Sequence, residues 1–390
     1  MLGPAFLREI NQARVLRLLK EKGVLSRAEL ARHLGLTRST ITLVSNELIE
    51  KELVATTGEA FVTQLTGRPG EAVRLEPQGA FFLGAEIGAE EIHLVLINLV
   101  GAIIYRETVP HRSKTPKAVC QHLLDLVQRV WSEQLKNSQR LRGVGIAISA
   151  LLNNQGVIRK APTLGWRDVD LKAELLSKLP LPAFAENDAN AAALAELSFG
   201  GWTGHGDLCT LFLDLGVGAG IICERKLLRG SAGLAGEIGH LCLDPNKDRR
   251  DEELGSLESC LGGKSLLAAY RRAGGRARDL PGLIADLKNK AIGKKAVEAW
   301  GRWLALAISN LADLFNPKLV ILAGPLSELF PFVERDVRRQ LEKRKFPTME
   351  GLEIEVSAFG RDASALGGAA LVFDELFSLP DASFLGDLAA

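Results

Sequence analysis

The feature that most limits the fold is a strand–glycine–strand pattern that occurs twice in the chain. One copy, FFLGAEIGAEEIHLVLINLVGAIIYRETV, begins at Phe81, and the other, CTLFLDLGVGAGIICERKLLRG, begins at Cys209. In both copies a run of strand-forming residues reaches an acid, a glycine turn follows, and a second β-branched run comes after it. The repetition predicts two related halves with a cleft between them.

The bulk composition is that of a globular protein. With 390 residues, of which 47% are hydrophobic and 24% charged, the chain has room for two or three domains. No apolar run reaches the roughly 20 residues that a membrane helix needs, and residues 1–22 are charged, unlike a signal peptide. The five cysteines are odd in number and form no CxxC pair. We therefore expect reduced thiols and a cytoplasmic protein without a membrane partner.

Three helices are predicted at the start of the chain. Apolar periodicity favours a helix over residues 7–22, which the following glycine ends. Ser26 and Glu29 have the spacing of a capping box and begin a second helix, SRAELARHLG. Thr37 caps a third helix, RSTITLVSNELIEKEL. This arrangement is typical of a helix–turn–helix.

A wing is expected after the helices. Short strands are predicted over residues 53–57, 61–65 and 72–75, and the segment GRPG lies between the last two. Arg68, held between glycine and proline, suits a loop that enters the narrow minor groove of DNA. The alternative is that GRPG is only a turn. Together the helices and strands predict a winged helix–turn–helix domain over residues 1–77.

One side of the third predicted helix carries short polar side chains and an arginine. Short hydroxyl and amide groups let a helix lie deep in the major groove, and arginine reaches guanine or phosphate. Any three-helix unit has a polar face, but the helix–turn–helix spacing and the basic wing together favour DNA binding. The residues predicted to contact DNA, besides Arg68, are Thr37, Arg38, Ser39, Thr40, Thr42, Ser45 and Asn46.

Two motifs in the remainder of the chain carry a family resemblance. They are AENDANAAALAE at residues 185–196 and AGEIGH at residues 235–240. From Phe81 onward the chain resembles the ROK family of repressors and sugar kinases. The resemblance implies an α/β, two-lobed actin/hexokinase-like (ribonuclease H-like) fold. With a winged helix in front, the whole chain is similar to the repressor branch of that family.

The resemblance also suggests where the lobes begin and end. Residues 76–79, EPQG, are expected to form a hinge after the head. A small lobe is expected over residues 80–200, completed by the C-terminal helix. A large lobe is expected over residues 201–390.

The two glycine turns depart from the pattern of the family's kinases. Those kinases carry Asp-x-Gly-x-Thr at the first phosphate turn, whereas this chain has EIGAE beginning at Glu86. Glu90 places a negative charge where the γ-phosphate would lie, and like charges repel. The second turn is DLG at Asp214, where the kinases have Gly-Thr-Gly. We therefore expect neither ATP as a cofactor nor kinase activity, and we expect Glu91 to be a solvated turn residue.

A sugar site is implied by the resemblance. Carboxylates and an amide suit a polyol, because they accept and donate hydrogen bonds to hydroxyl groups. The alternative for the first two residues is that they only cap the following helix. The residues predicted to surround one sugar are Asn187, Asp188, Glu237, His240 and Glu258.

The family's zinc site is expected to be absent. Family members bind zinc with a histidine and three cysteines, but the positions matching the cysteines are Arg249, Asp251 and Ser256. Arginine cannot ligate zinc. Cys242 and Cys260 leave a rearranged site as an alternative. No metal is therefore predicted.

Two further departures predict an altered ligand pocket. The family's usual Pro-Gly is Leu151-Leu152 here, and the family's sugar-contacting asparagine is Thr163.

We predict a sugar-responsive transcriptional regulator, a repressor in type, without kinase activity. It would bind a pseudo-palindromic double-stranded operator as a homodimer or a dimer of dimers, because one recognition helix covers one half-site. One alternative is an ATP-dependent sugar kinase fused to a DNA-binding head. The other is a constitutive DNA-binding protein whose lobes serve only dimerisation.

Overall fold

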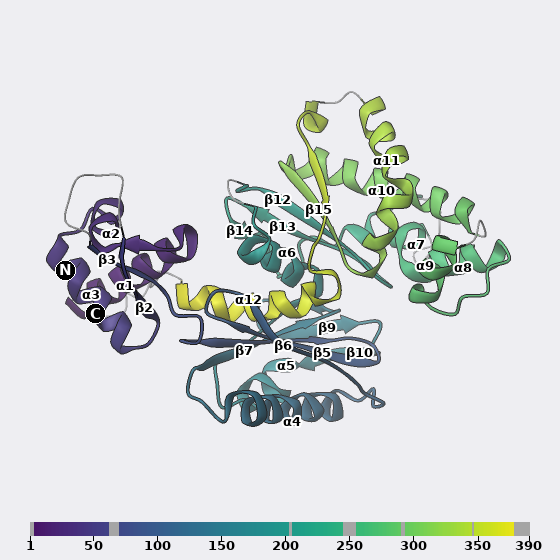
Figure 1. The fold of residues 1–390 in the computed structure, drawn as a ribbon. Helices are drawn as coiled ribbons and strands as arrows, with labels where there is room; N and C mark the ends of the chain where they lie inside the picture. Colours follow the sequence, from purple (N-terminus) through teal and green to yellow (C-terminus); the bar gives the residue numbers. More distant parts are fainter. Residues whose placement is uncertain are drawn as a thin grey trace.

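The protein consists of a small head and a body of two lobes (Figure 1). In Figure 1 the lobes lie one above the other, and helix α12 (Ala363–Phe377) runs between them toward the head. Each lobe combines a mixed five-stranded sheet with helices, which confirms the predicted α/β class. The computed structural model describes residues 4–61, 70–202, 205–244, 255–289, 293–344 and 347–377.

The head has three helices and a three-stranded sheet in the order β1-β3-β2. Its elements are α1 (Pro4–Lys22), β1 (Leu25–Ser26), α2 (Arg27–Leu34), α3 (Arg38–Glu50), β2 (Val54–Phe61) and β3 (Gly70–Leu75). The three predicted helices are confirmed, but α1 begins three residues before the predicted start and α3 ends at Glu50, three residues before the predicted end. Ser26 and Glu29 form a capping box, and Gly35, with φ 66°, ends α2 in the left-handed conformation. Thr37 caps α3 by accepting the N–H of Thr40 at 3.2 Å.

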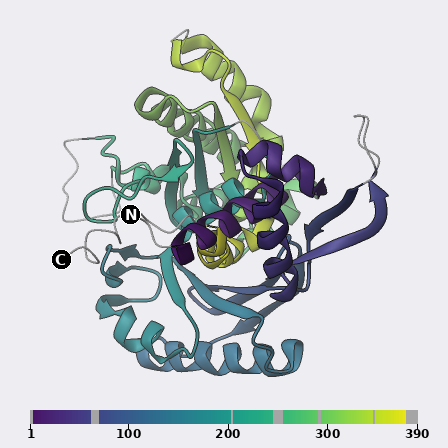
Figure 2. The same cartoon turned by 90° about the vertical axis from the view of Figure 1, so that its left-hand side faces the viewer.

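The wing differs in part from its prediction. The strands expected over residues 53–57 and 61–65 are not separate, because β2 runs without a break to Phe61. Residues 62–69, including Arg68, lie outside the described residues. Figure 2, in which the head faces the viewer, shows the β2–β3 hairpin projecting to one side of the body. Strand β1 was not predicted, because a strand of two residues has no periodic pattern.

The first lobe is built on a sheet in the order β11-β7-β4-β5-β6. Helix α4 packs on one face of this sheet and α12 on the other. Strands β8, β9 and β10 form a small second sheet. The elements are β4 (Phe81–Ile87), β5 (Glu91–Asn98), β6 (Ile103–Pro110), α4 (Pro116–Leu135), β7 (Leu141–Ile148), β8 (Leu151–Leu152), β9 (Val157–Ala161), β10 (Trp166–Asp170), α5 (Leu171–Glu174), η1 (Leu176–Lys178), β11 (Ala183–Asn187) and α6 (Asp188–Phe199).

The second lobe is built on a sheet in the order β14-β13-β12-β15-β16. The apolar face of α10 packs against this sheet and against α11. The elements are β12 (Leu208–Leu213), β13 (Val217–Cys223), β14 (Lys226–Leu227), η2 (Ile238–His240), α7 (Glu258–Leu261), α8 (Gly263–Arg272), α9 (Leu280–Asn289), α10 (Lys294–Phe315), β15 (Leu319–Ala323), η3 (Pro325–Leu329), α11 (Phe330–Arg344), η4 (Pro347–Met349), β16 (Glu353–Val356) and η5 (Gly360–Asp362).

The two five-stranded sheets have the same topology, which confirms the prediction of two related halves. Each begins with an antiparallel hairpin, β4–β5 in the first lobe and β12–β13 in the second. A third antiparallel strand follows the hairpin, β6 or β14. Two parallel strands complete the other edge, β7 and β11 in one sheet and β15 and β16 in the other.

Helices α6 and α12 pack against each other between the two sheets. Helix α6 contacts β12 and β13, whereas α12 contacts β4, β5 and β7. Backbones meet here without side chains between them. A Cβ placed on Gly367 would lie 1.8 Å from the carbonyl oxygen of Ala191, and one on Gly145 would lie 1.7 Å from that of Gly368. A larger residue at either glycine would force these elements apart.

The head shares an apolar core with the first lobe. Val15, Leu19 and Leu48 from the head are buried in one cluster with Phe82 of β4 and Phe373 of α12. Such continuous burial is the dominant stabilising contribution to a junction of this kind.

The predicted hinge at residues 76–79 is packed on both sides. The N–H of Leu99 donates to the carbonyl oxygen of Pro77 at 3.1 Å. A Cβ on Gly79 would lie 2.1 Å from the carbonyl oxygen of Glu52. Any hinge motion at this segment has to break these contacts.

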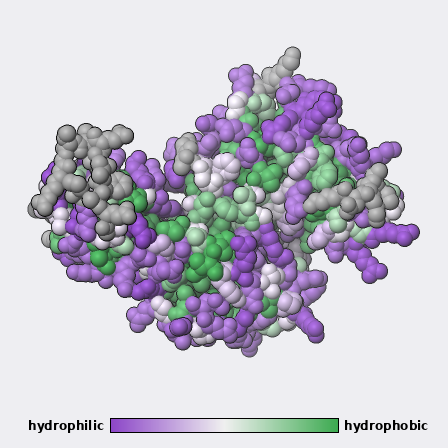
Figure 3. All heavy atoms as spheres, viewed as in Figure 1, coloured by the Kyte–Doolittle hydropathy of each residue, from purple (hydrophilic) through white to green (hydrophobic). Residues whose placement is uncertain are grey.

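Within the described part of the chain, no helix is both long and apolar enough to span a membrane. In Figure 3 hydrophilic atoms cover most of the outer faces, while hydrophobic atoms gather near the centre of this view.

Candidate functional site

The five residues predicted to bind a sugar line one cavity of about 600 Å³ between the lobes. The first two come from the end of β11 and the start of α6, and the others come from η2, the residue before it, and α7. They are Asn187, Asp188, Glu237, His240 and Glu258. The structure therefore brings all five together, in a volume that suits a small ligand. Their contact with a sugar stays a prediction.

Asn187 is fixed by the capping interactions that were its alternative role. Its Oδ1 accepts the N–H groups of Ala189 at 2.9 Å and Asn190 at 3.2 Å. Its Nδ2 donates to the carbonyl oxygen of Ala150 at 3.2 Å. Asp188 also accepts the N–H of Ala189, at 2.9 Å, and its side chain hydrogen-bonds with Ser149, which lines the same cavity.

Three carboxyl groups lie close enough in the cavity to influence one another. Burial raises the pKa of Asp188 to about 6. Burial, and then the charges of Asp188 and Glu258, raise the pKa of Glu237 to about 7. Glu258 is held by the N–H of Val217, which donates to its Oε2 at 2.9 Å. His240 lies 3.9 Å from Glu237, between Nε2 and Oε2, and its side chain is half exposed.

The rest of the lining mixes apolar and basic groups. Leu151 and Thr163, the two positions that departed from the family pattern, both face the cavity. The hydroxyl oxygen of Thr163 is buried and has no hydrogen-bond partner among the described residues. Lys160 and Lys264 also line the cavity. A ligand with several hydroxyl groups fits this set, because the acids accept its protons and the lysines donate to its oxygens.

The acidic residues of the two glycine turns lie near a positively charged side chain of the same protein. Burial, followed by the charges of Asp188 and Asp214, raises the pKa of Glu86 to about 8. Burial also raises the pKa of Asp214. Arg361, in η5, opposes both shifts, because its positive charge lies near both carboxyl groups. An arginine of the chain therefore lies near the acids of both glycine turns.

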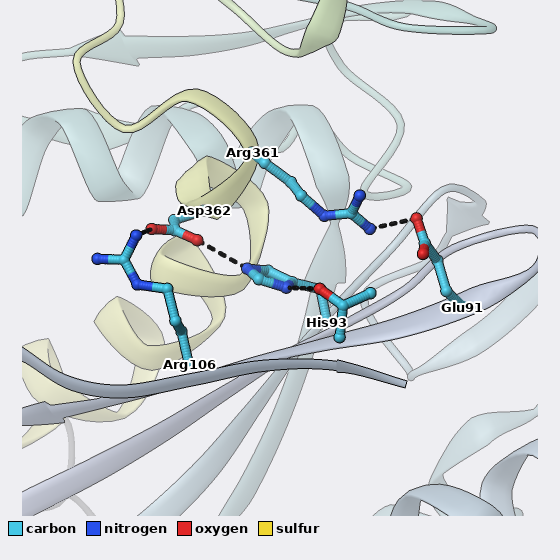
Figure 4. A network of polar contacts seen from close by, with 6 residues as sticks. Glu91, His93, Arg106, Arg361 and Asp362 are labelled. Carbon is cyan, nitrogen blue, oxygen red and sulfur yellow. Dashed lines mark hydrogen bonds and ion pairs between the residues drawn. The ribbon is translucent and has the colours of Figure 1, made fainter. Parts of the chain in front are cut away.

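Arg361 also changes the interpretation of Glu91. The sequence analysis expected Glu91 to be a solvated turn residue, but it begins β5 and pairs with Arg361 (Figure 4). The two residues are 270 positions apart in sequence. No local pattern could have indicated this pair.

A buried histidine joins the same region to the start of α12. Nε2 of His93 lies 2.7 Å from Oδ1 of Asp362, and its Nδ1 lies 2.7 Å from the hydroxyl oxygen of Thr108. Arg106 pairs with the other oxygen of Asp362 at 3.0 Å. Figure 4 shows His93 and Arg106 approaching Asp362 from neighbouring strands. This network ties β5 and β6 to the turn that precedes α12.

The positions that match the family's zinc ligands lie partly within the described residues. Ser256 and Cys242 pair in an isolated bridge and both line the cavity. Arg249 and Asp251 lie outside the described residues. Among the residues that the structure describes, no group of three or more His, Cys, Asp or Glu side chains is arranged to hold a metal ion.

Most residues predicted to contact DNA lie on the outer side of α3. Thr37, Arg38, Ser39, Thr42 and Asn46 are exposed, and Thr40 is half exposed. These residues form one continuous outer surface with the start of the helix. Their contact with DNA stays a prediction.

Ser45 does not belong to this surface. It has 0% exposure, and its hydroxyl has no partner among the described residues. At about 100° per residue, Ser45 lies roughly 40° from Ile41 and 60° from Leu48 around the helix. Both of those residues are fully buried. Ser45 was wrongly grouped with Asn46 because the polar character of its side chain outweighed its position.

Two comparisons decide what the chain is. The model of the ROK family matches residues 82–375, and the model of the MarR family matches residues 9–57. The chain belongs to the ROK family. Its winged head, joined to the family's sugar-kinase-like body, makes it a DNA-binding transcriptional regulator of that family.

Full-length relatives of this ROK regulator are repressors. It is 28% identical to the xylose repressor of Bacillus spizizenii, over 96% of this chain and 97% of that protein. It is 25% identical to the DNA-binding transcriptional repressor Mlc of Escherichia coli, over 95% of each chain.

Solved structures match the fold of this ROK regulator as a whole and in part. A crystal structure of a ROK family transcriptional regulator, homologous to E. coli Mlc, has a TM-score of 0.79 and covers 95% of this chain and 97% of its own, at 24% identity. A ROK family glucokinase from Streptomyces griseus, in complex with glucose and AMPPNP, has a TM-score of 0.62 at 26% identity. That match covers 75% of this chain and 99% of the kinase. The family therefore includes kinases as well as regulators.

Proposed function

We propose that this ROK regulator is a sugar-responsive repressor that binds operator DNA through α3 and a small sugar through the cavity between the lobes, without phosphorylating the sugar. The observation that carries the proposal is the physical continuity of the two sites. Helix α6 begins at the cavity, α12 packs along α6, and the core of the head continues into α12. A ligand that changes the arrangement of the two lobes therefore also shifts α6 and α12, which connect the cavity to the head.

The sugar end of this route starts at α6. Asp188 is its first residue and Asn187 is its cap, so a ligand bound to Asp188 pulls directly on the start of the helix. Glu237 and Glu258 approach the same ligand from the second lobe. Since hydroxyl groups would bridge acids from both lobes, we expect binding to favour a more closed arrangement.

The DNA end of the route is an ionic junction around Asp374 of α12. Its Oδ2 accepts the hydroxyl of Ser198, in α6, at 2.8 Å. Its Oδ1 lies 3.5 Å from Nζ of Lys20, in α1. Nζ of Lys20 also lies 4.3 Å from the ring centroid of Phe373, a cation–π contact. A shift of α6 along α12 would therefore change how α1 is held, and with it the orientation of α3.

The absence of kinase activity is argued from the glycine turns. Glu86 and Glu91 stand at the first turn, and Arg361 faces both of them. A nucleotide phosphate would have to approach the Glu91 carboxylate, which repels it, and displace Arg361 from that partner. Both steps oppose phosphate binding.

The assembly is proposed to be a homodimer, or a dimer of dimers, on a pseudo-palindromic operator. One α3 covers one half-site, so two copies are needed for a complete operator. We further propose that residues 1–77, 80–200 with α12, and 201–390 act as head, small lobe and large lobe.

One experiment tests both ends of the proposal. DNA fragments bound by the full chain would be selected from a random-sequence library and titrated in a mobility-shift assay with and without xylose, glucose or N-acetylglucosamine. We expect one sugar to change operator affinity about tenfold, and Asp188→Asn to abolish that change while preserving affinity in its absence. Arg38→Ala should weaken binding and lower its salt dependence. ADP release in the presence of ATP, magnesium and the same sugars, lost in Asp188→Asn, would show a kinase instead.

A further inference from the structure

An apolar side chain stands on the exposed side of α3, beside the polar residues proposed to contact DNA. Leu43 is 53% exposed. At about 100° per residue it lies roughly 160° from the buried Ile41, on the opposite side of the helix. Its neighbours on that side are Ser39, one turn before, and Asn46, three residues after, and both are exposed. A single exposed leucine is ordinary on a protein surface. The significance of Leu43 therefore depends on the polar groups around it.

The polar groups around Leu43 are largely satisfied within the head. The hydroxyl of Thr42 donates to the carbonyl oxygen of Arg38 at 2.9 Å. The hydroxyl oxygen of Thr37 lies 2.9 Å from that of Ser39. Fewer hydroxyl groups are therefore free to read bases than the sequence suggested, and the apolar share of this surface is larger.

Asn46 presents only its donor group. Arg27 donates from Nη2 to Oδ1 of Asn46 at 3.0 Å. Since arginine has no acceptor, the atom it contacts must be the amide oxygen. The NH₂ group of Asn46 then remains as a hydrogen-bond donor, on the same exposed side of the helix as Leu43.

An apolar group beside a hydrogen-bond donor matches one base in the major groove. Thymine presents its C5 methyl group next to the O4 acceptor, whereas cytosine presents a donor and no methyl group. We propose that Leu43 determines sequence specificity by contacting the C5 methyl group of a thymine in each operator half-site. The inference rests on the proposed role of α3 in binding DNA.

The test removes that methyl group alone. The probe is a duplex selected by the full wild-type chain from a random-sequence library, with each thymine replaced singly by deoxyuridine. At one thymine of each half-site we expect wild-type affinity to fall about fourfold, the value of one buried carbon group. Leu43→Ala should bind the thymine and deoxyuridine duplexes equally. If wild type tolerates every replacement, or if Leu43→Ala shows the same loss at the same thymine, the proposal is wrong.

Two controls separate this inference from the function on which it rests. Leu314→Ala removes another exposed leucine, 64% exposed in the last turn of α10 in the second lobe, and should keep the wild-type response to deoxyuridine. Arg38→Ala should weaken binding to every duplex. Loss of affinity in Arg38→Ala without any methyl dependence would overturn the role of Leu43 and retain α3 as the DNA-binding helix. Unchanged affinity in both Arg38→Ala and Leu43→Ala would overturn the proposed binding face itself.

Discussion

Arg229 of the second lobe donates from Nε to Oε2 of Glu186 in the first lobe at 2.9 Å. Glu186 is buried and its other oxygen accepts the N–H of Asn187 and the Nδ2–H of Asn190, both at 3.1 Å. A residue of one lobe therefore neutralises the carboxylate that positions a cavity residue of the other.

Replacing Arg229 with methionine should destabilise the protein by about 1–2 kcal/mol. The charge of Glu186 would lose its cationic partner but keep two N–H donors. Because Arg229 is partly exposed, the cost stays below the roughly 3–5 kcal/mol of breaking a fully buried ion pair. Urea denaturation measures this change. Arg159→Met is the matched control, because Arg159 pairs with Asp168 at 3.0 Å on the surface, and it should shift stability by less than about 0.5 kcal/mol. Equal effects of the two changes would contradict a role for Arg229 between the lobes.

Stability without ligand should decrease as pH rises from 5 to 8. Burial raises the pKa of Asp188 to about 6, of Glu237 to about 7 and of Glu86 to about 8, all above their values in the unfolded chain. The folded state then holds more protons between about pH 4 and pH 8, so the cost of burying these charges is absent below pH 4 and develops as pH rises.

We expect a loss of several kcal/mol in the free energy of unfolding over this range, measured by urea denaturation at several pH values. Glu86→Gln should flatten the dependence, since it removes one of the titrating groups. Glu90→Gln changes an exposed residue of the same turn and serves as the control. Stability that rises with pH in the wild-type chain would contradict the burial of these acids in protonated form.

Asp374→Ala should uncouple the two sites without abolishing either. Lys20 and Ser198 both lose their shared partner, so α1 and α6 are no longer joined through α12. We expect sugar binding, followed by thermal shift, and operator binding to persist, while the effect of sugar on operator affinity falls below about twofold. Lys22→Met alters an exposed lysine at the end of α1 and should leave the coupling intact. A full sugar response in Asp374→Ala would exclude this junction as the route.

Ser45→Ala should leave DNA binding unchanged and alter stability by less than about 1 kcal/mol, toward a gain. Its buried hydroxyl has no partner among the described residues, so its removal relieves an unsatisfied polar group. Mobility shift and urea denaturation measure the two properties. Asn46→Ala, one residue further and exposed, should weaken DNA binding. A loss of operator affinity in Ser45→Ala would return this residue to the DNA-contacting surface.

Local patterns predicted the parts of the fold that are determined locally. The capping box at Ser26, the cap at Thr37 and the duplicated hairpins all depend on residues close in sequence, and the structure has them as expected. The residues that the family resemblance implied around Asn187 and Glu237 also line one cavity.

The rest depends on contacts that no local pattern contains. The pairing of Arg361 with Glu91 and of His93 with Asp362 joins residues about 270 positions apart. The burial of Ser45 follows from the angle of α3 against its neighbours, which periodicity approximates only to within one position. The shared core of head and first lobe was missed for the same reason, since each contributing residue also fits a separate domain.

That shared core limits how the head can be used outside this chain. A fragment holding only residues 1–77 would expose Val15, Leu19 and Leu48, which are buried together with Phe82 and Phe373 of the body. Grafting this head onto another ligand-binding protein would therefore require a matching apolar surface on the recipient. On the proposed role of α3, the DNA specificity of this regulator is transferred by exchanging the outer residues of that helix, whereas the domain as a whole is not portable.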